Sequence, residues 1–152
     1  MIATSHALTG AAIGSVVKKP FLAIPLAFIS HFMIDALPHF GINMTFGSTA
    51  MVWWLILDGL ALCAVALFLK KRVQSPLFLA ICAFAAMAPD FAWLLYGILG
   101  NELAFDPLTQ FHGMIQWHES ISGIFVDVLW ITLMAGIILR YNHEDNQDTA
   151  AN

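Results

Sequence analysis

The sequence has few charged residues. Lysine and arginine together number 6 in 152 residues, and charged residues of both signs make up 11% of the chain, whereas a soluble domain carries about 25%. Hydrophobic residues make up 60%. Because so few polar side chains are available to face water, the composition predicts an integral membrane protein whose apolar surface is covered by lipid.

Several kinds of functional site are also missing. The two cysteines, Cys63 and Cys82, form no CxxC pair and no haem-attachment motif, so we interpret them as small buried hydrophobic residues. The sequence has no GxSxG elbow for a serine nucleophile. It also has no glycine-rich nucleotide loop and no basic patch, so nucleic acid is not an expected partner.

The apolar segments predict the fold class. Residues 49–69, 76–99 and 119–140 each have about the 20 mostly apolar residues that a membrane-crossing helix needs. Two shorter apolar segments, 4–17 and 20–37, precede them and are separated by two lysines. The second segment opens with Pro20, and proline is tolerated at a helix start. We therefore predict an all-α, polytopic membrane bundle of about five helices, the first one short.

The basic residues predict how this bundle is oriented. They all fall at one set of predicted helix ends: Lys18, Lys19, Lys70, Lys71, Arg72 and Arg140. The positive-inside rule places these ends in the cytoplasm, with the N-terminus outside and the C-terminus inside. The expected location is the cytoplasmic (inner) membrane of a bacterium or archaeon.

Domain organisation follows from the same pattern. Residues 1–141 should form one membrane-embedded domain, and the polar segment 142–152 a disordered cytoplasmic tail. The long outer connection, residues 100–118, is half apolar. We expect it to lie on the membrane surface as a lid, with a short helix after Asp106 and Pro107.

One apolar segment carries the spacing of a metal-binding helix. His31 and Asp35 are four residues apart and therefore share a helical face. Such a pair can give two ligands to one metal ion, as in HExxH helices. His39 is a further candidate ligand, although Pro38 can turn it away from that face. The alternative is a hydrogen-bonded His–Asp pair that only packs helices.

Other polar residues in apolar surroundings extend this candidate site. His6 precedes Gly10 and Gly14 on one face, and this GxxxG pattern lets another helix approach closely, so His6 should point into the bundle. Asp90 follows Pro89, which should kink its helix. The alternative for His6 is a terminal histidine at the membrane interface.

Acidic residues within the predicted spans should face the bundle interior. A carboxylate at bilayer depth costs about 2.5–3.5 kcal/mol, so such residues usually have a function. Asp58, Asp90 and His31 lie at similar depths, about 14 Å from the outer helix ends at 1.5 Å per residue, and could therefore meet. The alternative for Asp58, Asp90 and Asp127 is a protonated carboxyl group that hydrogen-bonds between helices.

The last predicted span begins with two further candidates. His118 could ligate a metal ion, and Glu119 could be the general base for a metal-bound water, with Asp58 as the other candidate base. The alternative is a surface histidine followed by a helix-start acid. His112, on the outer connection, could close over the site, and its role is left open.

These candidates form one nitrogen and oxygen ligand set. The predicted metal ligands are His6, His31, Asp35, Asp90, His118 and His39. Imidazole and carboxylate ligands suit Zn²⁺ best, with Mn²⁺ or Fe²⁺ as further possibilities.

Four short motifs resemble those of a known family. They are Ser5-His6-Ala-Leu-Thr-Gly10, Ser30-His31-Phe-Met-Ile-Asp35, Ala88-Pro89-Asp90 and Trp117-His118-Glu119-Ser120. Together they look like the motifs of the YdjM-like membrane-bound metal-dependent hydrolases, although the SHxxxD motif comes earlier here. The resemblance implies a small inner-membrane protein with a bound divalent metal and hydrolase activity. It implies metal-binding roles for His6, His31, Asp35, Asp90 and His118.

The leading hypothesis is a membrane-embedded metal-dependent hydrolase. Its partners would be membrane lipids, and its substrate a lipid or lipid-linked ester or phosphoester near the outer leaflet. One alternative is an ion- or proton-coupled transporter, since intramembrane acids mark ion pathways. Another is a non-catalytic membrane protein with a structural metal site. Haem held between histidine pairs is a further alternative.

Overall fold

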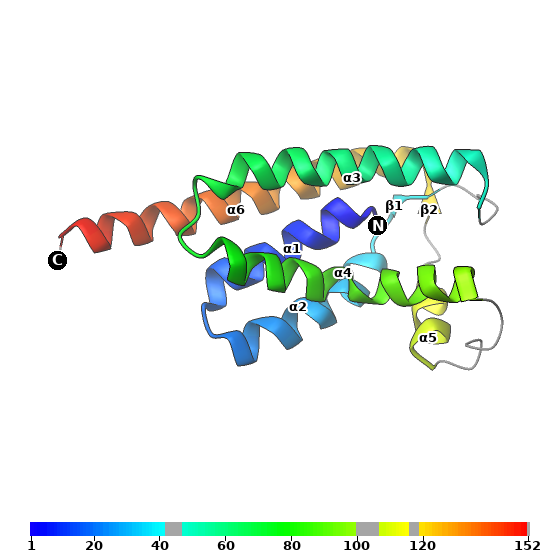
Figure 1. Ribbon diagram of the computed structural model, residues 1–152, viewed down its shortest axis with the longest axis horizontal. Helices are drawn as coiled ribbons and strands as arrows, with labels where there is room; N and C mark the ends of the chain where they lie inside the picture. The colour runs from blue at the N-terminus through cyan, green and yellow to red at the C-terminus, as the bar shows by residue number, and fades with distance from the viewer. Residues whose placement is uncertain (42–46, 100–106, 116–118, 152) are drawn as a thin grey trace.

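The computed structural model describes residues 1–41, 47–99, 107–115 and 119–151 (Figure 1). For residues 93, 96, 97, 99, 107–109, 119 and 143–151 it describes the backbone alone. The helices are α1 (Ala3–Val17), α2 (Pro20–Asp35), α3 (Thr49–Lys70), α4 (Pro76–Leu99), α5 (Pro107–Ile115) and α6 (Ile124–Ala151). The strands are β1 (His39–Phe40) and β2 (Glu119–Ser120).

Helix α1 lies at the centre of the bundle and contacts α2, α3, α4 and α6. Its glycines explain the close packing against α4. A Cβ atom on Gly10 would lie 2.2 Å from the carbonyl oxygen of Cys82 and 2.9 Å from Cβ of Ala86. A Cβ atom on Gly14 would lie 3.0 Å from Sγ of Cys82. The GxxxG prediction is therefore confirmed, because these two helices meet where α1 has no side chain.

Two described stretches are long and apolar enough to cross a membrane, namely Thr49–Lys70 and Ile121–Asn142. The apolar helices Pro20–Asp35 and Pro76–Ala92 are shorter. Large apolar side chains point outward along several helices, including Phe21 on α2 and Phe125 on α6. The mainly helical class is thus confirmed, and a bundle that crosses the membrane about five times stays a prediction.

The helix ends that carry the basic residues gather at one end of the bundle. The connection from α1 to α2 and the connection from α3 to α4 both lie toward the end at which α6 leaves the bundle (Figure 1). Lys18 and Lys19 are in the first connection, and Lys71 and Arg72 are in the second. The structure therefore brings together the charges that the positive-inside rule uses.

Helix α6 begins later than the sequence predicted. A 3₁₀ turn, Ile121–Gly123, precedes it, and Glu119 and Ser120 pair in parallel with His39 and Phe40. Ser120 caps the turn, since its Oγ accepts a hydrogen bond from the Gly123 N–H at 3.2 Å. A Cβ atom on Gly123 would lie 2.0 Å from the His39 carbonyl. The first residues of the predicted 119–140 helix are extended because they pair with β1.

The contacts of α6 with the rest of the bundle extend to Asn142. Asn142 is buried, its Oδ1 accepts a hydrogen bond from the Gln74 N–H at 3.1 Å, and its Nδ2 donates one to Ser15 Oγ at 3.2 Å. Helix α6 then continues to Ala151, and the predicted division of the chain at residue 141 stays a prediction. The segment contains neither proline nor glycine, so no residue in it breaks the helix.

Candidate metal centre

The last turn of α2 supplies two of the site residues. His31 and Asp35 are fully buried, and His31 Nε2 lies 3.1 Å from Asp35 Oδ2. His31 Nδ1 lies 2.7 Å from the carbonyl oxygen of Ala86 on α4. Because a carbonyl can only accept, Nδ1 carries the proton and Nε2 presents its lone pair to the site. This is the arrangement in which proteins hold metal-binding histidines, with the outer nitrogen fixed by a second group.

Helix α1 adds His6. Its ring stacks on that of His31, with the centroids 3.9 Å apart. His6 Nε2 lies 3.1 Å from Asp35 Oδ1, yet neither ring nitrogen makes a hydrogen bond with any described residue. A buried polar atom without a partner costs about 1–3 kcal/mol, which a ligand at this position would offset.

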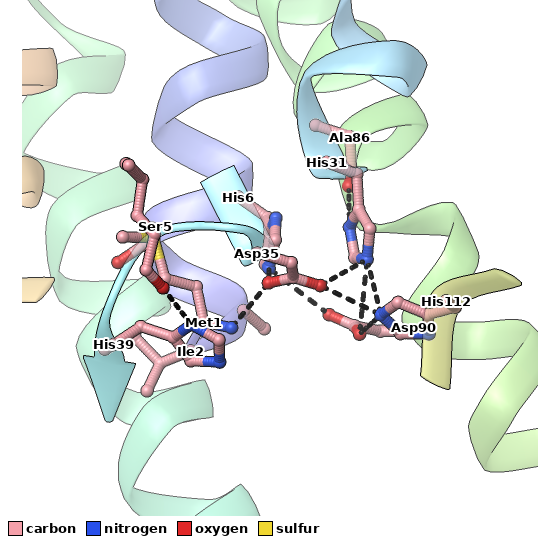
Figure 2. A network of polar contacts seen from close by, with 12 residues as sticks. Met1, Ile2, Ser5, His6, His31, Asp35, His39, Ala86, Asp90 and His112 are labelled. Carbon is pink, nitrogen blue, oxygen red and sulfur yellow. Dashed lines mark hydrogen bonds and ion pairs between the residues drawn. The ribbon is translucent and has the colours of Figure 1, made fainter. Parts of the chain in front are cut away.

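Asp90, which follows Pro89 on α4, completes the group. Its Oδ1 lies 3.7 Å from His31 Nε2, and its Oδ2 lies 4.0 Å from His6 Nε2. One ligand atom from each of His6, His31, Asp35 and Asp90 lies within 4.8 Å of the others. Figure 2 shows these side chains turned toward one another. Four of the six predicted ligands therefore converge, and this buried group could hold a metal ion.

His112, on α5, also faces this group. Its Nε2 lies 2.9 Å from both His31 Nε2 and Asp35 Oδ2, and its side chain is 4% exposed (Figure 2). From the sequence we expected that His112 could close over the site, and its role was left open. The sequence signal was the short helix expected after Asp106 and Pro107, which did not show which way His112 would face.

A positive charge already lies beside the buried carboxylate of Asp35. The ammonium group of Met1 is 2.6 Å from Asp35 Oδ1, and both groups are fully buried. Three imidazoles, two carboxylates and one amine therefore lie close together. The cluster is enclosed on most sides, and Asp90, at 28% exposure, is its most accessible described member.

The structure places Asp58, a predicted proton acceptor, against the start of α1, and its catalytic role stays a prediction. Its Oδ2 accepts a hydrogen bond from the Ala3 N–H at 2.7 Å, and its Oδ1 accepts others from the Thr4 N–H at 3.2 Å and the Thr4 hydroxyl at 2.5 Å. Asp58 thus caps the N-terminus of α1 from a neighbouring helix. Both oxygens are engaged in this contact, which accounts for a carboxylate buried in α3.

Asp127 has a similar structural role. Its Oδ1 accepts a hydrogen bond from the Ser5 hydroxyl at 2.7 Å, and its Oδ2 accepts one from the Phe40 N–H at 2.9 Å. This carboxylate therefore joins α6 to the start of α1 and to β1 through the hydrogen bonds that it accepts.

Three predicted site residues remain, namely His39, His118 and Glu119. His39 is not brought to the group, because α2 ends at Asp35 and the chain turns at Pro38 into β1, where His39 Nδ1 contacts the Leu37 carbonyl at 2.7 Å. His118 lies outside the described residues, and Glu119 is described by its backbone alone. Metal binding by His118 and base catalysis by Glu119 stay predictions.

Comparison with known proteins identified no relative of this chain. No protein-family model, curated protein or solved structure matches the chain. The resemblance to the YdjM-like hydrolases therefore stays a hypothesis that rests on the four short motifs.

The donor set has the spacing and the chemistry of a divalent metal site. Ligands on a tetrahedral ion with bonds of about 2.0–2.1 Å are roughly 3.3–3.4 Å apart. The nitrogen–oxygen distances around Asp35 are 2.9–3.1 Å, and those around Asp90 are 3.7–4.0 Å. Small side-chain shifts would bring both carboxylates to ligand spacing.

Proposed function

We propose that this protein is a membrane-embedded hydrolase that uses a divalent metal ion. The observation that carries the proposal is the convergence of His6, His31, Asp35 and Asp90 from three helices, with His31 Nδ1 hydrogen-bonded to a main-chain carbonyl. A His–Asp pair that only packed helices together would not explain why His6 is buried while neither of its ring nitrogens makes a hydrogen bond with a described residue. Zn²⁺ is the proposed ion, and Mn²⁺ or Fe²⁺ would fit the same donors.

The proposed substrate is a lipid or lipid-linked ester or phosphoester. Two features support this class of substrate. The first is the apolar exterior of α3 and α6, which suits lipid surroundings. The second is the partial exposure of Asp90, which leaves the site reachable. The proposed location is the inner membrane of a bacterium or archaeon, with the site toward the outer leaflet.

The residues of the chain would have distinct tasks. The bound cation would lower the pKa of a water molecule and polarise the scissile bond. His31, fixed by Ala86, and His6, stacked on it, hold two nitrogens in place. Asp35 contacts both rings, with Oδ1 3.1 Å from His6 Nε2 and Oδ2 3.1 Å from His31 Nε2. Asp90 is the carboxylate that an incoming polar group could contact, and Glu119 is the proposed proton acceptor.

Metal analysis of the purified full chain in detergent tests the proposal. We expect at least one tightly bound divalent ion per chain and its loss in the double variant His31→Ala, Asp35→Ala. The matched control is His143→Ala, which changes a histidine near the end of α6. A wild-type chain without stoichiometric metal, or a double variant that keeps it, would refute the metal centre.

Hydrolysis is tested separately on the metal-loaded protein. Fluorogenic phospholipids and lipid esters in mixed micelles should be cleaved, and a chelator should abolish the cleavage. Readdition of Zn²⁺ or Mn²⁺ should restore it. Stoichiometric metal in a chain that cleaves none of these substrates would instead support the structural-metal alternative.

A further inference from the structure

The oxygen atoms of the two clustered carboxylates are divided between two sides of the site. Asp35 Oδ1 lies 3.1 Å from His6 Nε2, whereas Asp35 Oδ2 lies 3.1 Å from His31 Nε2 and 2.9 Å from His112 Nε2. Asp90 is split in the same way. Its Oδ2 is the atom near His6, and its Oδ1 is the atom near His31 and His112.

One side has the donor set of a four-coordinate ion. Its atoms are His31 Nε2, His112 Nε2, Asp35 Oδ2 and Asp90 Oδ1. The two nitrogens lie 2.9 Å apart, and their distances to the two oxygens are 2.9, 3.1, 3.7 and 3.7 Å. These values bracket the roughly 3.3–3.4 Å expected between ligands of a tetrahedral zinc ion. The two imidazole nitrogens also face each other directly, which a shared cation would explain.

The other side has fewer protein donors. It consists of His6 Nε2, Asp35 Oδ1 and Asp90 Oδ2, with nitrogen–oxygen distances of 3.1 and 4.0 Å. The Met1 ammonium group lies 2.6 Å from the same Asp35 oxygen, so a metal ion bound here would take the place of that positive charge. His6 is fully buried, and its ring nitrogens have no hydrogen-bond partner among the described residues. Three protein ligands that leave a position for water are typical of a catalytic ion.

From this division we propose that the centre holds two divalent ions bridged by Asp35 and Asp90. His6 binds one ion, and His31 and His112 bind the other. The inference rests on the proposed metal-dependent function and goes beyond it in the number of ions and in the role of His112. Bridged ions in hydrolytic two-metal sites are about 3.5–4 Å apart, a distance that a carboxylate can span with its two oxygens.

The arrangement makes α5 part of the centre. Without His112 the second ion would keep one imidazole and two carboxylate oxygens, so its affinity should fall most when α5 is altered. Phe32 on α2 packs against Phe111, with ring centroids 5.4 Å apart, and lies 6.2 Å from the His112 ring. These contacts position the α5 histidine over the α2 ligands.

Counting ions per chain tests the proposal. The purified full chain is loaded with Mn²⁺, freed of loose metal by gel filtration and analysed by mass spectrometry of the metal. We expect about two ions per chain in the wild type and about one in both His112→Ala and His6→Ala, as the bridged two-ion arrangement requires. His143→Ala should keep both ions.

A spectroscopic measurement on the wild type avoids dependence on variant folding. Two Mn²⁺ ions that share carboxylates should give an exchange-coupled electron paramagnetic resonance spectrum, with hyperfine lines at half the spacing of an isolated ion. The spectrum of His112→Ala should revert to that of an isolated ion, and circular dichroism checks that this variant keeps its helices.

The outcomes separate the two proposals. One ion per chain with an uncoupled spectrum would overturn the two-ion centre and leave the metal-dependent hydrolase standing. Two ions that both remain in His112→Ala would overturn the assignment of His112. A chain that binds no stoichiometric metal would refute the proposed function itself.

Discussion

The bundle contains two pairs of aspartates whose surroundings differ sharply. Asp58 and Asp127 accept hydrogen bonds from main-chain N–H groups and hydroxyls at the start of α1 and at β1. Asp35 and Asp90 instead face the Nε2 atoms of histidines. All four lie in apolar segments, so hydropathy alone does not separate them.

The difference shows what distinguishes a structural carboxylate from a ligand. Backbone N–H groups at a helix N-terminus need acceptors, and a capping carboxylate meets that need completely. When one nitrogen of an imidazole ring donates to a carbonyl, the other nitrogen has a lone pair available for a metal ion. A neighbouring carboxylate oxygen offers a further lone pair. The second pair therefore concentrates lone pairs, which a cation stabilises.

Replacing Asp35 should have the largest effect. Asp35→Asn keeps the size of the side chain but removes the charge shared by both histidine-bearing sides of the centre. Metal affinity should fall by more than the roughly 10–100-fold that loss of an outer-shell partner costs. Competitive titration with a chelating dye measures the change. In the matched control, Asp127→Asn, the affinity should stay within a few-fold of the wild type. Equal losses in the two variants would contradict the division of the aspartates.

Gly10→Ala should disturb both pairs at once. The added methyl group would lie 2.2 Å from a Cys82 main-chain oxygen, so α1 must move away from α4. Overpacking of this kind costs about 1–3 kcal/mol or more, and the same movement separates His6 from Asp90. Thermal unfolding in detergent and metal titration should both report a loss. Gly136→Ala on α6, where a new Cβ atom meets nothing within 4 Å, is the control. Wild-type stability in Gly10→Ala would contradict the close packing.

Asp58→Ala should separate stability from metal binding. It leaves the Ala3 and Thr4 N–H groups without their acceptor, and an unsatisfied buried donor costs about 1–3 kcal/mol. The melting temperature should therefore fall, while the folded fraction below the transition keeps its full metal content. A variant that melts normally but has lost its metal would restore Asp58 to the reactive centre.

Much of the fold was predictable from the sequence. The apolar runs placed α3 and α4 close to their observed bounds, and Pro20 marked the start of α2. The glycine spacing identified the face of α1 that meets α4. These features are local, because helix length, proline and small-residue spacing act within one segment. The pairing of β1 with β2 joins segments about 80 residues apart, and no local sequence pattern predicted it.

The site was predictable to the extent that it depends on helical spacing. His31 and Asp35 share a face wherever a helix forms, and the intramembrane cost of Asp90 indicated that it turns inward. His39 could not be placed, because its direction depends on how the chain leaves α2. Likewise the roles of Asp58 and His112 depend on which elements pack beside them. Asp58 meets the start of α1, and α5 carries His112 onto α2.

The smallest predicted effect comes from Ser5→Ala, and it tests how sharply the two pairs are separated. Ser5 donates to Asp127 Oδ1, whereas the next residue along α1, His6, faces Asp35. Removing the hydroxyl costs one hydrogen bond, about 0.5–1.5 kcal/mol of stability, and Asp127 keeps its contact with Phe40. The melting temperature should fall slightly, with the metal affinity unchanged. Because successive side chains on a helix point about 100° apart, these neighbours can serve different carboxylates. A loss of metal in Ser5→Ala would instead mean that the capping contacts fix the position of His6.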